Sequence, residues 1–217
     1  MHSELPNHIV RLKRALANQL PGENAHRLML PKGRELQPSV ASGTILQSSV
    51  LMLLFPENGN LNTCLIRRPT TMRNHGGQVA FPGGRFEPSD ITLEQTALRE
   101  SFEEIGTDRN KIELIGELTP LYVQVSNFTI HPFIGYSDTI PIFKTDNQEV
   151  EELFIIPVSR FVEHASPHLQ NVNTIYGPIE VPGFYIDNLF IWGATAMIVS
   201  EFNEVYKSEF LKSPKSE

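Results

Sequence analysis

The sequence contains a single cysteine, Cys64, among its 217 residues. One cysteine cannot form a disulfide within the chain, which excludes the small secreted domains that depend on disulfide networks. The N-terminal segment has charged residues spread through it in place of the apolar core of a signal peptide. We therefore expect a reducing, cytoplasmic location.

Long apolar runs are also missing from the sequence. A membrane-spanning helix needs about 20 consecutive apolar residues, whereas runs such as residues 49–55 are short and rich in strand-forming side chains. The composition, with 40% hydrophobic and 20% charged residues, is typical of a globular protein with one sizeable core. We expect a soluble single domain over residues 1–217, with an N-terminal helix and extension in residues 1–40, a core in residues 45–205 and no membrane partner.

Basic residues are outnumbered, with 18 Lys and Arg against 25 Asp and Glu and a net charge of −7. This balance argues against a general nucleic-acid-binding surface, because phosphate backbones are held by an excess of Lys and Arg. Six of the 25 acidic residues lie between Glu87 and Glu104. Such a cluster favours a counter-ion, and a metal ion is the first candidate.

The N-terminal part of the chain shows one helical pattern and one hairpin pattern. Residues 5–20 carry Leu and Ile at helical intervals, with basic residues on other faces, and predict an amphipathic helix. Residues 48–55 and 62–66 are apolar runs separated by the sequence Pro-Glu-Asn-Gly-Asn, a strong turn signal. They predict a β-hairpin.

The rest of the chain alternates between strand and helix patterns. After a short apolar piece and a Gly-Gly loop, Ser89 and Asp90 are candidate caps of a helix that runs to Gly106. Strands are expected over residues 111–125, 129–136 and 153–158, and a closing helix over residues 192–202. Successive strands interrupted by isolated helices predict an α+β fold in which a mixed sheet packs between helices.

Three carboxylates are predicted to share one face of the helix that ends at Gly106. At about 100° per residue, Glu100, Glu103 and Glu104 fall within about a third of the helix circumference. Like charges at this spacing repel one another, and a hard cation such as Mg²⁺ would offset the repulsion. Arg99 stands four residues before Glu103 and is expected to hold it. A solvated acidic helix face is the alternative interpretation.

The glycine pair Gly83 and Gly84 precedes this helix. Glycine allows a positive φ and close approach of the backbone, so we expect the loop to fold back beside the carboxylates. Backbone N–H groups would then lie near a bound phosphate.

The segment from Gly84 to Gly106 resembles the Nudix box, whose usual form is G, five residues, E, seven residues and REUxEExGU, with U an aliphatic residue. The matching positions of its second half are Arg99, Glu100, Glu103, Glu104 and Gly106. Ser101 and Phe102 stand at the aliphatic and free positions, and Thr107 replaces the last aliphatic residue.

The first half of the box departs further. Asp90 stands where Glu is usual, and eight residues instead of seven separate it from Arg99. The same Asp and the same extra residue are features of the coenzyme A branch of the family, so the departure is itself a resemblance to that branch.

The resemblance implies a Nudix-type α/β/α sandwich and a hydrolase that depends on Mg²⁺ or Mn²⁺. Glu100 and Glu104 would be the principal metal ligands, with Asp90 as a further candidate. Glu103 would be another ligand or the base that activates water. The implied catalytic residues are Glu103, Glu100 and Arg99.

A second pattern lies upstream, in residues 65–84. It resembles the signature of Nudix coenzyme A pyrophosphatases, which reads LLTxR(S/A), three residues, R, three residues, G, three residues and FPGG. The residues in register are Arg68, Arg73, Gly77 and 81–84. Ile66 replaces the Thr of the signature, and Pro69 replaces the Ser or Ala.

Coenzyme A carries a pyrophosphate and a 3′-phosphate, and guanidinium groups bind phosphates through paired hydrogen bonds. The residues expected to contact the substrate are Arg68, Arg73, Gly83, Gly84, Arg85 and His75. A solvated loop is the alternative interpretation for the arginines, and His75 is also typical of a structural hydrogen-bonding residue.

A further acidic group follows the box at Glu149, Glu151 and Glu152. Nudix enzymes often take a catalytic carboxylate from a loop beyond the box, so each of the three is an alternative to Glu103 as the general base. A solvated loop is the other interpretation.

These resemblances imply hydrolysis of coenzyme A, or of a derivative, to 4′-phosphopantetheine and adenosine 3′,5′-bisphosphate. One alternative is a Nudix hydrolase of another nucleoside diphosphate derivative, such as ADP-ribose or NADH. A second is a Nudix-like binding module without turnover. The expected partner is a small molecule and not a nucleic acid, and a homodimer stays open.

Overall fold

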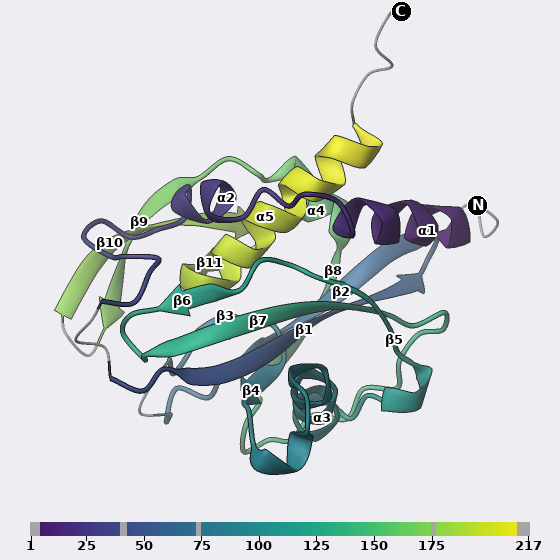
Figure 1. Cartoon of the computed structure of the whole chain (residues 1–217), viewed down its shortest axis with the longest axis horizontal. Coiled ribbons are helices and arrows are strands. Elements are labelled where there is room, and N and C mark those ends of the chain that lie inside the picture. Colours follow the sequence, from purple (N-terminus) through teal and green to yellow (C-terminus); the bar gives the residue numbers. More distant parts are fainter. Residues whose placement is uncertain (1–4, 40–42, 73–74, 175–176, 212–217) are drawn as a thin grey trace, which may run out of the picture.

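The fold is that of a computed structural model, which describes residues 5–39, 43–72, 75–174 and 177–211. One predicted substrate contact, Arg73, lies outside these residues. Figure 1 shows helix α3 (Leu93–Ile105) on one face of a sheet, and helices α1 (Leu5–Leu16) and α5 (Gly193–Phe210) on the other. This three-layer arrangement is the one that the sequence patterns predict.

Strand β1 (Leu46–Glu57) is the centre of an eight-stranded mixed sheet. It pairs in parallel with β7 (Phe128–Tyr136), and antiparallel with β2 (Asn60–Arg67) and β4 (Gly83–Arg85). The strands paired farther out are β3 (Val79–Ala80) and β8 (Glu152–Pro157) on β2, and β5 (Glu113–Glu117) and β6 (Leu121–Val123) on β7. The prediction of a mixed sheet is confirmed.

Residues of β1 alternate between two hydrophobic cores. Met52 and Leu54 face the core that the sheet forms with α1 and α5. Leu51, Leu53 and Phe55 face the core on the α3 side. Side chains of a strand point alternately to opposite faces, so a continuous apolar run is what a strand covered on both faces requires.

The predicted hairpin is present, with a tighter turn than the sequence suggests. Asn58 and Gly59 have φ values of 52° and 79°, and Pro56 lies within β1 opposite Leu61. An Asn-Gly pair with positive φ at both positions matches the right-handed twist of the flanking strands. The turn therefore takes two residues, and the strands extend closer to it than expected.

Helices α1 and α5 lie against each other at one side of the molecule. Ile9 and Leu12 of α1 are buried, and Arg11 donates to Glu209 of α5 at 3.0 Å. Helix α1 ends at Leu16, before the expected residue 20, and α5 continues to Phe210, past the expected residue 202.

A second, three-stranded antiparallel sheet was not predicted. Its strands are β9 (His168–Thr174), β10 (Gly177–Ile186) and β11 (Leu189–Trp192). Strand β9 is mostly polar and β10 contains two Gly and two Pro residues, which are depleted in strands. The remaining elements are α2 (Glu23–Arg27), α4 (Val158–Glu163), and the 3₁₀ turns η1 (Pro88–Asp90) and η2 (Arg109–Lys111).

None of the helices in the described part of the chain combines the length and apolar character that crossing a membrane requires.

Candidate active site

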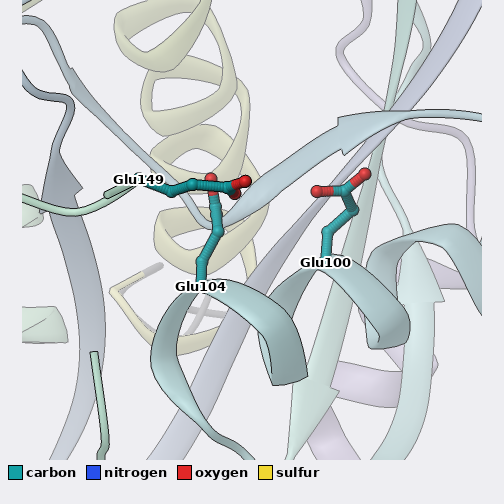
Figure 2. Close-up of side chains that lie close together, drawn as sticks. All are labelled: Glu100, Glu104 and Glu149. Atoms are coloured by element: carbon teal, nitrogen blue, oxygen red, sulfur yellow. The ribbon is translucent and has the colours of Figure 1, made fainter. Parts of the chain in front are cut away.

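Three carboxylates converge beside helix α3 (Figure 2). Glu100 and Glu104 come from successive turns of the helix, and Glu149 comes from the segment before β8. One oxygen atom of each carboxylate lies within 4.8 Å of the other two. We call these three residues the carboxylate group. Glu104 is buried, Glu100 is partly buried and Glu149 is exposed, so the group opens to solvent on one side.

Local capping sets where α3 begins and ends. The side chain of Thr92 accepts a hydrogen bond from the Gln95 N–H, and Gly106 ends the helix with a φ of 74°. Thr92 is thus the N-cap, and the prediction of Ser89 or Asp90 was wrong. Those two residues belong to η1, which precedes the cap.

One face of α3 is buried against the sheet. Ala97, Ser101 and Ile105 are fully buried under the sheet. Phe102 lies off this face: it is 51% exposed, and the Arg109 guanidinium lies 5.6 Å from its ring centroid. Small residues at the contact let the helix approach β1 and β4 closely, which brings Glu100 and Glu104 near the Gly-Gly segment.

Gly83 and Gly84 form the short strand β4, not a loop. Neither glycine has a positive φ, so the predicted loop conformation was wrong. The close approach is confirmed: a Cβ on Gly84 would lie 2.4 Å from the carboxylate atoms of Glu100, and one on Gly83 would lie 2.3 Å from the Ser49 carbonyl oxygen. The Gly83 N–H donates to Glu104 Oε2 at 2.8 Å.

Burial raises the pKa of the Glu104 carboxyl to about 8. The Gly83 N–H and the Arg68 guanidinium oppose this shift without cancelling it, and Glu100 adds to it. Burial also raises the pKa of Glu100, against the effect of Arg99. Carboxylates whose ionised forms are disfavoured in this way are stabilised by a cation placed among them.

The chemistry of the carboxylate group fits a hard divalent cation. Its donors are carboxylate oxygens alone. Oxygen ligands suit Mg²⁺ and Mn²⁺, and Mg²⁺ keeps several waters that a phosphate oxygen can replace. The residues therefore fit the metal that the Nudix resemblance implies.

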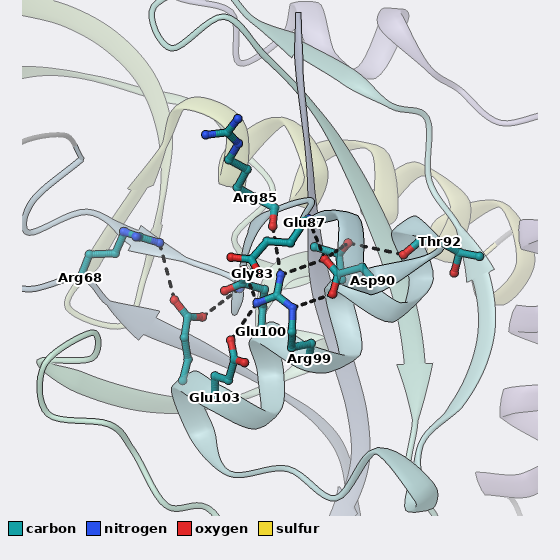
Figure 3. A network of polar contacts seen from close by, with 11 residues as sticks. Arg68, Gly83, Arg85, Glu87, Asp90, Thr92, Arg99, Glu100 and Glu103 are labelled. Carbon is teal, nitrogen blue, oxygen red and sulfur yellow. Dashed lines mark hydrogen bonds and ion pairs between the residues drawn. The ribbon is translucent and has the colours of Figure 1, made fainter.

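Arg99 is the centre of a polar network that orients this helix face (Figure 3). Its Nε and Nη2 donate to the two oxygens of Asp90 at 2.6 and 3.0 Å. Its Nη1 donates to Glu103 at 2.8 Å and lies 2.9 Å from Glu100. The predicted contact between Arg99 and Glu103 is therefore confirmed.

Asp90 belongs to this network and lies outside the carboxylate group. It is 4% exposed, and it accepts further hydrogen bonds from the Thr96 hydroxyl at 2.9 Å and the Glu87 N–H at 2.8 Å. The hydrogen bond from Arg99 holds the pKa of Asp90 at about 2, despite its burial. Asp90 holds Arg99 in this structure, and its role as a metal ligand stays a prediction.

Glu103 also lies outside the carboxylate group. Its side chain is 49% exposed and paired with Arg99. Although Glu103 and Glu104 are neighbours, one faces solvent and the other is buried under β4. The role of Glu103 as ligand or base stays a prediction.

The cationic residues of the second motif are spread over a wider area. Arg68 Nη1 lies 3.7 Å from Glu104 Oε1, at the edge of the carboxylate group. The side chain of Arg85 is exposed and extends away from α3, while its carbonyl accepts from Arg99. His75 is exposed, has a φ of 59° and bonds to Gln78 at 3.0 Å.

The three later acidic residues have different partners. Glu151 accepts a hydrogen bond from the Thr70 N–H at 3.2 Å, and Glu152 pairs with Arg67 at 3.3 Å. Only Glu149, of these three, reaches the carboxylate group. The sequence marks all three as candidates but carries no local signal that separates them.

Comparison with known sequences gives the family. The NUDIX domain profile matches residues 45–173. An uncharacterized Nudix hydrolase, NudL, of Photorhabdus laumondii is 33% identical over 63% of this chain and 73% of its own length. A probable Nudix hydrolase of Schizosaccharomyces pombe is 31% identical over 77% of this chain and 59% of its own length. Nudix hydrolase 3 of Caenorhabditis elegans is 35% identical over 54% of this chain and half of its own length.

Comparison with solved structures supports the fold. The crystal structure of the Nudix hydrolase RenU from M. smegmatis superposes with a TM-score of 0.50 at 16% identity, and covers 78% of this chain and 90% of that one. The family profile spans both the second motif and the box, and the relatives agree with it. This chain belongs to the Nudix hydrolase family.

Proposed function

We propose that this Nudix hydrolase cleaves the diphosphate bond of coenzyme A, or of a coenzyme A derivative, and releases 4′-phosphopantetheine and adenosine 3′,5′-bisphosphate. The observation that carries the proposal is the convergence of Glu100, Glu104 and Glu149 next to Arg68. It supports metal-assisted attack on a diphosphate. The coenzyme A signature in residues 65–84 supports the identity of the molecule that bears it.

Glu100, Glu104 and Glu149 are the residues that would hold Mg²⁺ or Mn²⁺. A bound ion of this kind neutralises charge that builds up on phosphate oxygens during hydrolysis. The Gly83 N–H and the Arg99 side chain orient Glu104 and Glu100, so the ligands need little rearrangement to accept it. Preorganised ligands of this kind lower the free-energy cost of assembling the site.

In the reaction, water attacks one phosphorus, the bridging P–O bond breaks, and a carboxylate takes up the proton of the water. We assign this acceptor first to Glu149, because its carboxylate lies in the group and is exposed to solvent, with which it can exchange the proton. Glu103 is the alternative; Arg99 holds its carboxylate on the solvent side of the helix. Arg99 acts by orienting Glu100.

Substrate recognition is assigned to the cationic residues around the group. Arg68 is close enough to Glu104 for its guanidinium to contact a diphosphate held there. The space beside the glycines of β4 is filled by Glu100 and by the β1 backbone, so their contact with a phosphate stays a prediction. A 3′-phosphate needs a second cationic contact farther from the metal, and Arg73, Arg85 and His75 are the candidates.

The test is a panel assay with Mg²⁺ or Mn²⁺ in which products are identified by mass spectrometry. The panel contains coenzyme A, 3′-dephospho-coenzyme A, ADP-ribose and NADH. We expect coenzyme A to be cleaved best, on the order of tenfold better than the 3′-dephospho form, because an ionic contact to the 3′-phosphate is lost. Equal turnover of ADP-ribose would contradict the substrate assignment. Ligand binding without any product would indicate a binding module.

A further inference from the structure

We propose that Asp146 is a positioning residue that presents Glu149 to the carboxylate group, a role that rests on the proposed function. Glu149 lies far along the chain from Glu100 and Glu104, so its position depends on how the segment between β7 and β8 is held. Asp146 bonds both to the helix that carries Glu104 and to the turn that carries Glu149.

The first half of this segment is tied to the end of α3. The Asp146 N–H donates to the carbonyl of Glu104 at 2.9 Å, and the Lys144 N–H donates to the carbonyl of Ile105 at 2.9 Å. Carbonyls in the last turn of a helix have no partner within the helix. The segment therefore satisfies them, and it connects Asp146 directly to the backbone of Glu104.

The second half is a turn built on Asp146. Its carbonyl accepts from the N–H groups of Glu149 at 3.0 Å and Val150 at 2.8 Å. Its Oδ1 accepts from the Gln148 N–H at 2.8 Å. This is an Asx turn, in which a short side-chain oxygen fixes the backbone two residues ahead. The direction in which Glu149 leaves the backbone follows from that geometry.

Both sides of the turn are anchored in the fold. Val150 is 2% exposed and packs in the core on the α3 side, and the Glu151 N–H donates to the Arg67 carbonyl at 2.9 Å. On the other side, the ring of Phe143 packs edge-on against Phe55, with centroids 5.5 Å apart. With both ends held, residues 146–149 are the part whose conformation decides where the Glu149 carboxylate lies.

The side chain of Asp146 acts through one acceptor, so the role can be tested by residue type. Asp146→Asn keeps an Oδ1 acceptor, Asp146→Ser keeps a weaker one, and Asp146→Ala has none. We expect Asp146→Ala to lower kcat roughly five- to tenfold, the change that loss of one hydrogen bond converts to. Asp146→Asn should stay within about twofold of wild type, and Asp146→Ser should lie between.

A second readout is independent of turnover. Calorimetric titration with Mn²⁺ alone measures how well the carboxylate group binds a cation. Glu149→Gln should lower Mn²⁺ affinity, kcat or both. Asp146→Ala should lower the same quantities to a smaller extent. The double variant should be no worse than Glu149→Gln, because a residue that acts through Glu149 has no effect once that carboxylate is gone.

The matched control is Asp108→Ala. Asp108 is the N-cap of η2 and makes the same kind of Asx contact, to the Asn110 N–H at 3.0 Å, outside the carboxylate group. It should lose a similar amount of stability and keep full kcat and Mn²⁺ affinity. The inference is overturned if Asp146→Ala behaves like Asp108→Ala, or if the Asp146 and Glu149 effects add in the double variant.

Two other results are also decisive. Wild-type Mn²⁺ affinity and kcat in Glu149→Gln would overturn the inference, because there would be nothing for Asp146 to position. If Asp146→Ala does not fold, the other two variants carry the test. Asp146→Asn should then have a higher kcat and Mn²⁺ affinity than Asp146→Ser, and equal values would overturn the inference. Mn²⁺ binding that follows these predictions without cleavage of any diphosphate would reject the proposed function and keep the positioning role.

Discussion

Arg99 and Asp90 form a bidentate ion pair, with Nε 2.6 Å from Oδ1 and Nη2 3.0 Å from Oδ2. The side chains are 16% and 3% exposed, so solvent and salt screen the pair only weakly. The pair connects η1 to the helix face that carries Glu100. Asp90, the residue that departs most from the usual Nudix box, thus has a clear structural role: it orients Arg99, the arginine of that box.

Replacing Asp90 by Asn should destabilise the protein. It removes the charge that compensates Arg99, and breaking a buried pair by removing one partner costs about 3 kcal/mol. Urea denaturation of Asp90→Asn measures this free energy of unfolding. Glu94→Gln, at an exposed acid in the first turn of α3, is the control and should change this free energy by less than about 0.5 kcal/mol. Equal stability of the two variants would contradict a structural role for the pair.

The effect of Asp90→Asn should also depend on pH. The pKa of Asp90 is about 2 in the folded protein, against an ordinary value of 3.8. Because the folded value is the lower one, the ionised carboxylate stabilises the fold fully above about pH 5, by about 2 kcal/mol, and loses that effect as pH falls through 4 toward 2. Unfolding at about pH 3, 5 and 7 should show a wild-type advantage that shrinks in acid. A stability difference between wild type and Asp90→Asn that grows as the pH falls would contradict this prediction.

Gly83 and Gly84 should respond differently to alanine. A Cβ on Gly84 meets the end of the flexible Glu100 side chain, whereas a Cβ on Gly83 meets the Ser49 carbonyl and the Val50 backbone. Gly84→Ala should therefore displace a carboxylate and weaken Mn²⁺ binding about tenfold or more with little loss of stability. Gly83→Ala should lose about 2 kcal/mol or more of stability, since strand pairing must shift. Thermal unfolding and Mn²⁺ titration distinguish them, and identical profiles would refute the contrast.

Glu104→Gln should abolish turnover without unfolding the chain. The amide keeps an oxygen that accepts from the Gly83 N–H, but it removes the charge of the most buried member of the carboxylate group. We expect kcat to fall by about 10² or more. The melting temperature in metal-free buffer should be at least equal to that of wild type, because a neutral amide avoids the cost of burying an ionised carboxyl. Full turnover would contradict the metal-binding role of Glu104.

A second buried carboxylate, Glu201, stabilises the fold away from the active site. It accepts hydrogen bonds from the Gly22 N–H at 2.9 Å, and from the Thr119 N–H and hydroxyl at 3.1 and 2.6 Å, and it pairs with His26 at 3.0 Å. Burial alone would raise the pKa of Glu201, but the hydrogen bonds from His26 and Thr119 outweigh it and the pKa is lowered. The network joins the N-terminal segment to α5.

Glu201→Gln should therefore lower stability by about 3 kcal/mol and leave kcat per folded molecule unchanged. Amide hydrogen exchange should become faster in residues 20–27, since their anchor on α5 is weakened. Glu204→Gln, exposed on the same helix, is the control. A loss of kcat at full folding in Glu201→Gln would mean that the network also supports the active site.

Local patterns in the sequence predicted a large part of the fold. The hairpin of β1 and β2, helix α3 and the contact between Arg99 and Glu103 depend on neighbouring residues, so spacing along the chain is sufficient to infer them. The end of α3 at Gly106 was predicted correctly, whereas its N-cap and the conformation of Gly83 and Gly84 were predicted wrongly. Ser, Thr and Asp are all favourable N-caps, so residue type alone does not choose among them. The pairing of β4 with β1 holds the two glycines in a strand.

The sequence by itself determined the family, the acidic helix and the residues available to bind a cation, because these follow from residue type and helical spacing. Only the tertiary structure decided which carboxylates meet. Glu103 and Glu104 are adjacent in sequence, yet packing against β4 buries one and leaves the other beside Arg99 in solvent. Glu149 joins Glu100 and Glu104 because long-range hydrogen bonds tie its segment to the end of α3, a contact that no local pattern encodes.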